Sequence, residues 1–265
     1  MTTESGQNAI WVEITATRGS TPRDSGTAMQ VTAMRNDGTI GGGALEHQAI
    51  ALARAMLGTD ATEMVRRVPL GPGLGQCCGG AVTLRFTREP RPIDVVPFHL
   101  YPVHSHQPHP AFLWLWGAGH VGRAVVRACP PQAFRITWID EAADRFPDGA
   151  LTTPRSGSLT TVPAADMPRL AAHAPIHAHH LIFTYSHQID LALCAALLRR
   201  GAASIGLIGS QTKKARFWNR LRAMGLDPTP ITCPIGDRSL GKAPEAIARG
   251  TIAAMLAVTE QRIAS

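Results

Sequence analysis

Two adjacent cysteines, Cys77 and Cys78, stand in the glycine-rich run LGPGLGQCCGG at residues 70–80. Consecutive Cα atoms lie about 3.8 Å apart, below the roughly 4.4 Å usual for a disulfide, so we expect two free thiols. A thiolate is both a nucleophile and a soft metal ligand. The alternative is a tight glycine turn with the cysteines as small buried hydrophobes. Because the run holds five glycines, at 71, 73, 75, 79 and 80, we interpret it as a loop for metal or sulfur chemistry.

A second pattern with chemical meaning begins where the apolar run FLWLW meets GAGHVG at 117–122. The first glycine of such a turn permits the bend, the second lets a phosphate approach the backbone, and the third lets the following helix pack on the strand. These would be Gly117, Gly119 and Gly122. A strand predicted at 135–139 ends at Asp140, near the spacing at which an acid binds ribose hydroxyls. The alternative is that the glycines only close the turn and Asp140 caps the next helix.

Further polar residues follow the apolar segments at 181–184 and 204–208. Alternation of strands and helices favours a parallel sheet, and ligands bind at the carboxyl ends of such strands. We therefore expect one crevice to contain the polar and glycine residues that follow strands: Gly117, His120, His187, Ser210 and Lys213. His187 by itself is more often a structural histidine, and Lys213 with Lys214 is more often a solvated surface.

The elements that must position these residues divide into three predicted parts of an α/β protein. Residues 1–86 form a smaller α+β domain that contains the cysteine loop, with strands at 10–17, 29–34, 63–68 and 81–86 and a helix at 44–57. Residues 87–110 are a Pro- and His-rich linker, because their composition resists regular structure. Residues 111–265 form a Rossmann-like parallel-sheet domain that ends in a long helix from Pro244.

Composition excludes several classes of protein. No apolar run reaches the roughly 18 residues of a membrane span, and the first residues do not resemble a signal peptide. Five scattered cysteines fit a reducing compartment, so we expect a cytoplasmic protein. The net charge of +7 can attract phosphate-bearing ligands or an acidic partner. We interpret the Lys and Arg residues as dispersed along the chain, and no base-stacking motif accompanies them, so we expect no nucleic-acid binding.

Together the motifs resemble the XdhC/CoxI family of accessory proteins for xanthine dehydrogenase and related molybdenum hydroxylases. The similarity runs through nearly the whole chain, in the family's order. It consists of GSTPRDSGTAM at 19–29, GTIGGGALE at 38–46, LGPGLGQCCGG at 70–80, GAGHVG at 117–122, TYSHQIDL at 184–191, IGLIGSQTKKARF at 205–217 and PIGDRSLGKAPEAIA at 234–248. Two residues depart from the family pattern: Tyr185 stands where His is expected, and Met255 where many members have Glu.

The resemblance implies a chaperone for the molybdenum cofactor rather than an enzyme. Such a protein binds molybdopterin cofactor, holds it while a cysteine desulfurase exchanges an oxygen ligand for sulfur, and delivers it to the molybdenum subunit of apo xanthine dehydrogenase. It is also expected to form a homodimer.

As a hypothesis from the residue chemistry, Cys77 or Cys78 coordinates or shields the molybdenum, with Gln76 and Gly79 beside them. The phosphate of the cofactor would bind to the amides after Gly117 or near Arg18 and Arg23. The crevice residues would grip the pterin, NAD(P) or another nucleotide: Gly117, Gly119, His120, Gly122, Asp140, His187, Ser210 and Lys213.

Two other functions remain open. An NAD-dependent oxidoreductase would use the glycine turn and Asp140, with His187 as acid or base. A sulfurtransferase would carry a persulfide on Cys77 or Cys78.

Overall fold

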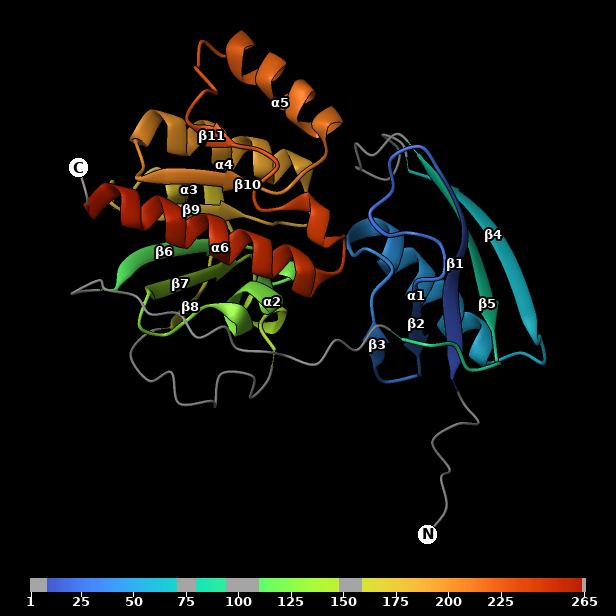
Figure 1. Ribbon diagram of the computed structural model, residues 1–265. Coiled ribbons are helices and arrows are strands. Elements are labelled where there is room, and N and C mark those ends of the chain that lie inside the picture. Colours follow the sequence, from blue (N-terminus) through green and yellow to red (C-terminus); the bar gives the residue numbers. More distant parts are fainter. Residues whose placement is uncertain (1–8, 71–79, 94–109, 148–158, 264–265) are drawn as a thin grey trace. The chain divides into compact units, whose positions relative to one another are not determined.

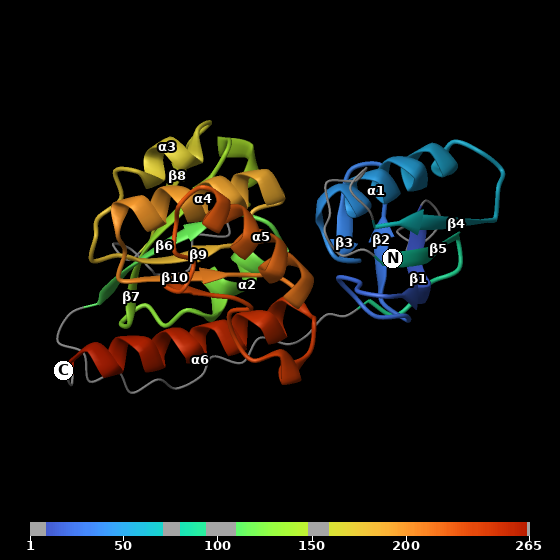
Figure 2. The same ribbon diagram turned by 90° about the horizontal axis from the view of Figure 1, so that it is seen from above.

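A computed structural model of the 265-residue chain describes residues 9–70, 80–93, 110–147 and 159–263. The chain divides into two compact units, Met1–Pro97 and Phe98–Ser265, shown in two views (Figures 1 and 2). Each unit is described by itself. Most of the predicted linker at 87–110 lies outside the described residues.

The first unit is a sheet of five described strands in the order β3-β2-β1-β5-β4, with all neighbours antiparallel. Its elements are β1 (Ile10–Arg18), β2 (Ala28–Val31), β3 (Asn36–Gly38), α1 (Gly43–Leu57), β4 (Glu63–Pro69) and β5 (Ala81–Thr87). Helix α1 packs on the sheet through Leu45, Ala49, Ala53 and Met56, which recur at the helical spacing of three or four residues. Gly58 caps its end, as predicted, by donating its N–H to carbonyls of the last turn.

The second unit contains a sheet of six described strands in the order β11-β10-β9-β6-β7-β8, and all neighbouring strands are parallel. The strands are β6 (Ala111–Trp116), β7 (Phe134–Asp140), β8 (Leu159–Pro163), β9 (His179–Ile182), β10 (Ser204–Leu207) and β11 (Ile231–Thr232). When these strands are numbered within the unit, their order reads 3-2-1-4-5-6 from the opposite edge. That order is the doubly wound Rossmann arrangement, in which ligands bind where the order reverses, here between β6 and β9.

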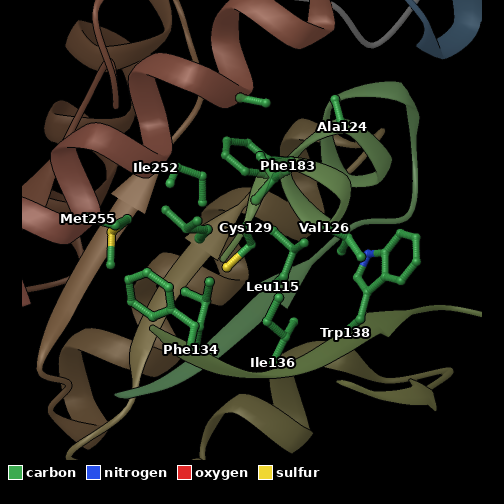
Figure 3. Close-up of a cluster of buried hydrophobic side chains, with 14 of the residues drawn as sticks. Leu115, Ala124, Val126, Cys129, Phe134, Ile136, Trp138, Phe183, Ile252 and Met255 are labelled. Atoms are coloured by element: carbon green, nitrogen blue, oxygen red, sulfur yellow. The ribbon is translucent and has the colours of Figure 1, made fainter. Parts of the chain in front are cut away.

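Helices cover both faces of the parallel sheet. They are α2 (His120–Ala128), α3 (Met167–Ala171), α4 (His187–Arg200), α5 (Gln211–Ala223) and α6 (Pro244–Ile263). Helices α2 and α6 share one apolar cluster with the sheet, and α3, α4 and α5 share the other; Figure 2 shows α6 and the pair α3 and α4 on opposite sides. Figure 3 shows Leu115 and Ile136 of the strands beneath Val126 of α2 and Ile252 of α6.

The predicted α/β fold class is confirmed, and most predicted elements are present with shifted ends. Strand β2 ends at Val31 instead of 34, because Thr32 and Arg35 bond to each other in a turn. Strand β9 lies two residues earlier than predicted. Helix α4 begins at His187 instead of 191, because Ser186 accepts a hydrogen bond from the N–H of Ile189 and so caps the helix. Strands β3, β8 and β11 and helix α3 were not predicted.

Candidate functional site

The three glycines of the turn between β6 and α2 differ in their surroundings. Gly117 has φ 113°, and a Cβ there would lie 2.4 Å from the carbonyl oxygen of Phe183. A Cβ at Gly122 would lie 2.1 Å from the carbonyl oxygen of Gly117. Gly119 is exposed, and a Cβ there would meet nothing within 4 Å. Two of the glycines are thus required by packing, whereas Gly119 leaves space for a ligand beside the first N–H groups of α2.

Asp140, at the end of β7, fixes this turn. Its Oδ2 accepts a hydrogen bond from the N–H of Ala118 at 2.6 Å, and its Oδ1 accepts one from the N–H of Glu141 at 2.7 Å. The residue is 4% exposed. The Nε1–H of Trp138 adds a bond of 3.0 Å to the carbonyl of Gly117. Asp140 therefore has a structural role in the turn that the sequence did not predict, and binding of ribose by its carboxylate stays a prediction.

A side-chain bridge joins the loops that follow β9 and β7. The hydroxyl of Tyr185 donates to Oε2 of Glu141 at 2.6 Å, and the guanidinium of Arg145 lies 5.2 Å from the centre of the Tyr185 ring. The hydrogen bond to Glu141 raises the pKa of Tyr185, and partial burial adds to the effect. Because β6 lies between β7 and β9 in the sheet, this bridge connects the two strands on either side of the glycine turn.

Lys213 is not part of a solvated surface, so that alternative is wrong. Its side chain is 6% exposed, and its Nζ lies 2.5 Å from Oδ2 of the fully buried Asp190. Nζ also donates to the carbonyl of Ile208 at 2.9 Å. The other oxygen of Asp190 accepts from the hydroxyl of Thr184 at 2.6 Å and its N–H at 3.3 Å. The ion pair thereby ties α5 and α4 to the loop after β9.

The remaining predicted crevice residues all lie at helix starts that follow strands. His120 is the first residue of α2, His187 is the first residue of α4, and Ser210 caps α5 by accepting from the N–H of Lys213 at 3.1 Å. Burial, reinforced by the positive charge of Lys213, lowers the pKa of His187 to about 4. His187 is therefore neutral at pH 7, and its ring can accept or donate one hydrogen bond at each nitrogen.

In the first unit, the end of the cysteine run at Gly80 contacts residues 18–23, which we call the arginine turn. The N–H of Leu70 donates to the carbonyl of Gly80 at 2.8 Å, closing the base of the loop. A Cβ at Gly80 would lie 2.4 Å from the carbonyl oxygens of both Arg18 and Ser20. The residues between these ends, which include Gln76, Cys77, Cys78 and Gly79, lie outside the described residues.

Beside this base, a buried acid holds a second glycine turn. Oε2 of Glu46 accepts from the hydroxyl of Thr39 at 2.5 Å and from the N–H groups of Ile40 and Gly42 at 3.0 and 3.1 Å. A Cβ at Gly41 would lie 2.6 Å from the ring of Pro22. Arg23, which follows Pro22 in the sequence, is 5% exposed. Sequence reasoning missed Glu46, although an acid in the first turn of a helix after GTIGGG is the signal that indicates it.

Two features are absent from the residues that the structure describes. Within the described ranges, no three His, Cys, Asp or Glu side chains are grouped so that they could hold a metal ion. No helix in the same ranges combines the length and the apolar character that crossing a membrane requires.

Comparison with known proteins identifies the family. Residues 113–255 match the XdhC Rossmann domain, and residues 2–68 match the XdhC and CoxI family. A curated relative, the uncharacterized protein YqeB of Escherichia coli (strain K12), is 25% identical over 252 residues, which are 93% of this chain and 42% of that protein. This chain thus spans less than half the length of that relative.

A crystal structure described as a xanthine dehydrogenase from Bacillus halodurans is also similar, with 17% identity and a TM-score of 0.48 over 98% of this chain and 94% of that one. The match to the Rossmann domain alone covers more than half of the chain. The chain belongs to the XdhC and CoxI family, and its second unit carries the Rossmann domain of that family.

Proposed function

We propose that this protein is an accessory protein of xanthine dehydrogenase maturation that carries molybdenum cofactor as its cargo. It binds the cofactor, holds it while a cysteine desulfurase replaces an oxygen ligand with sulfur, and delivers it to the apo-enzyme. The proposal is supported by membership of the XdhC and CoxI family and by the chemistry of the groups at one end of the first unit.

The observation that carries the proposal is the contact of Gly80 with the arginine turn. Because a Cβ at Gly80 would lie 2.4 Å from the carbonyl oxygens of Arg18 and Ser20, the loop that bears Cys77 and Cys78 ends beside Arg18. Soft thiolates suit a molybdenum centre, and guanidinium groups suit a phosphate. The cofactor contains both groups, so this donor set fits the proposed cargo.

Cofactor retention tests the binding role. We expect a Cys77→Ala, Cys78→Ala variant to retain at least about tenfold less molybdenum and pterin after gel filtration, because both soft ligands are lost. Arg18→Ala is expected to weaken retention by a smaller factor, and Arg66→Ala, an exposed arginine on β4 of the same unit, is the matched control. Full stoichiometry in the double cysteine variant would rule out the thiol role.

Delivery and sulfuration need a separate readout. Apo xanthine dehydrogenase should gain activity only when the loaded protein and a cysteine desulfurase are both supplied. The intact mass of this chain should stay unchanged after incubation with the desulfurase alone. A mass increase of one sulfur atom that the double cysteine variant lacks would instead favour the sulfurtransferase alternative.

A second candidate function is supported by the geometry of the second unit. The Rossmann strand order and the open space at Gly119 favour binding of a nucleotide pyrophosphate at the start of α2. A fluorescence titration with NADH tests it, with Gly119→Val as the variant that fills the space without an internal clash. Saturable binding that this variant loses, together with oxidation of a small alcohol or aldehyde, would favour the oxidoreductase. The absence of saturable binding would exclude NADH as the ligand.

A further inference from the structure

The positive charge of this chain is concentrated in one segment, contrary to the dispersed distribution interpreted above. Residues 191–226 contain seven Lys or Arg and no Asp or Glu. Outside this segment, 26 − 7 = 19 cations remain, which equals the 19 acids of the whole chain. Asp190 and Asp227 flank the segment, and when these two acids are included the excess is 7 − 2 = 5 positive charges.

Five of these seven residues lie on α5, and three of the five are exposed. Lys213 is buried against Asp190, and Phe217 and Leu221 form the rest of the buried side of the helix. Arg216, Arg220 and Arg222 are exposed. Arg216 and Arg220 lie one turn apart, and Arg222 lies farther around the helix; we call these three residues the basic face. Within the described ranges, none of the three forms a salt bridge. Figure 1 shows α5 at the outer edge of the second unit, beyond β11 and α4.

Helix stability does not account for the basic face. Like charges four residues apart, as at Arg216 and Arg220, destabilise a helix, and α5 contains no acid that could offset them. Arg222 interacts electrostatically with Asp227, whereas no salt bridge is found for Arg216 or Arg220 among the described residues. An exposed basic cluster raises the rate at which an acidic surface associates. Arginine is also enriched at protein interfaces.

The neighbouring apolar residues favour a protein over a nucleic acid as the partner. The ammonium group of Lys214 lies 5.2 Å from the ring centre of Trp218, which is partly buried, so this ring is not a free platform for base stacking. Met224, directly after α5, is 46% exposed. Exposed Met beside Arg is typical of protein interfaces.

We propose that the basic face of α5 is a docking surface for an acidic surface on the apo-enzyme that receives the cofactor. This inference rests on the proposed function, and it adds the surface and the kind of interaction through which delivery begins. Electrostatic attraction speeds the encounter of the two proteins, and the exposed Met224 contributes apolar contact once they have met.

Binding kinetics to the immobilised apo molybdenum subunit of xanthine dehydrogenase test this inference. We compare the wild type with Arg216→Glu, Arg220→Glu, Arg222→Glu and with a control triple variant, Arg66→Glu, Arg67→Glu, Arg169→Glu, whose three arginines are also exposed. Both variants change the net charge equally. We expect the association rate constant to fall at least about tenfold at low salt in the α5 variant only, with a weaker salt dependence. Replacing the three α5 arginines by Lys should preserve the rate, because the charge remains.

The other outcomes of the binding measurements overturn the docking proposal. An equal loss in the control variant would show that only net charge matters, and no loss in the α5 variant, or no binding by the wild type, would exclude the face as the docking surface. The wild type could instead bind a short DNA duplex or phosphatidylserine vesicles more tightly than it binds the apo subunit. If the α5 variant lost that binding, the face would be assigned to a nucleic acid or a membrane. Cofactor retention is measured on the same samples. If the wild type retains no cofactor but docks through α5, the proposed cargo fails while the docking surface stands.

Discussion

The two units each contain a glycine turn that a buried acid holds, but the surroundings of the two turns differ. In the first unit, Glu46 accepts from the N–H of Gly42, and the exposed Arg18 lies at the base of the cysteine run. In the second unit, Asp140 holds the turn through Ala118, and the nearby Lys213 is neutralised by Asp190. The first unit therefore has an exposed arginine whose backbone meets the end of the cysteine run, whereas the turn of the second unit offers backbone N–H groups and open space.

The comparison teaches that a charged residue at a strand end is not by itself a ligand-binding residue. In the second unit the charges serve the fold, because both Asp140 and Asp190 are buried and buried charges require partners. Four predictions, from the largest expected effect to the smallest, test this division of roles.

Loss of the buried ion pair should have the largest effect. Lys213→Met is expected to destabilise the protein by about 3–5 kcal/mol, because it leaves the charge of Asp190 buried without its partner. Chemical denaturation measures the change. Adding Asp190→Asn should recover a large part of it, since the amide oxygen can still accept from Thr184. A Lys213→Met protein of normal stability that fails to bind a nucleotide would show that the lysine contacts the ligand.

The two glycines at the start of α2 should separate packing from binding. Gly122→Ala is expected to cost about 3 kcal/mol, because its Cβ would lie 2.1 Å from a backbone oxygen. Gly119→Ala should cost less than about 1 kcal/mol, since its Cβ meets nothing within 4 Å. Thermal unfolding and ligand affinity are measured on both. Equal destabilisation by the two changes would contradict the roles assigned to the turn.

Acid should weaken the second unit through a buried histidine. His180 is fully buried and accepts from Nε1 of Trp116 at 3.2 Å, and burial lowers its pKa from 6.5 to about 3. Between these values the unfolded chain binds a proton that the folded chain does not. Stability is therefore full above pH 6.5 and falls as the pH drops toward 3, by about 2 kcal/mol at pH 5.

The variant His180→Asn cannot take up this proton, so the stability of its second unit should depend less on pH. Hydrogen exchange, resolved for each unit, measures this stability. His47→Asn, at an exposed position of α1 in the first unit, is the control. If acid opened the first unit before the second, His180 would not be the group responsible.

The bridge beside the second glycine turn should contribute least to stability. Tyr185→Phe removes one exposed hydrogen bond to Glu141 and is expected to cost less than about 1 kcal/mol. The chain has only two tyrosines, so an ultraviolet titration should lose the component whose pKa is raised. Faster ligand entry in this variant would show that the bridge obstructs the crevice. Loss of a component that titrates at the ordinary tyrosine pKa of about 10 would show that the bridge does not form in solution.

Local patterns predicted much of the fold. The apolar spacing of α1, the cap at Gly58 and the helix start at Pro244 depend on residues within a few positions of one another, which is the range over which helical periodicity and capping act. The bend at Gly117 was predicted, and binding of a phosphate beside Gly119 stays a prediction. The end of β2 and the start of α4 were displaced because they depend on hydrogen bonds in the adjacent turns.

The candidate site was predicted only in part. The sequence placed His187, Ser210 and Lys213 at strand ends, but it did not indicate that Lys213 is buried. It contained the excess charge of residues 191–226, which a count over a sliding segment would have revealed. It offered no local signal for the bridge from Tyr185 to Glu141, whose residues are 44 positions apart.

By itself, the sequence determined the order of the main strands and helices, the glycines that the turns require and the family to which the chain is similar. Only the tertiary structure decided which charged residues are neutralised. Asp190 and Lys213 are 23 positions apart and Ala118 and Asp140 are 22 apart, and each pair meets because strands from different parts of the chain lie side by side in one sheet. Propensity and periodicity act over a few residues, whereas ion pairing depends on that arrangement.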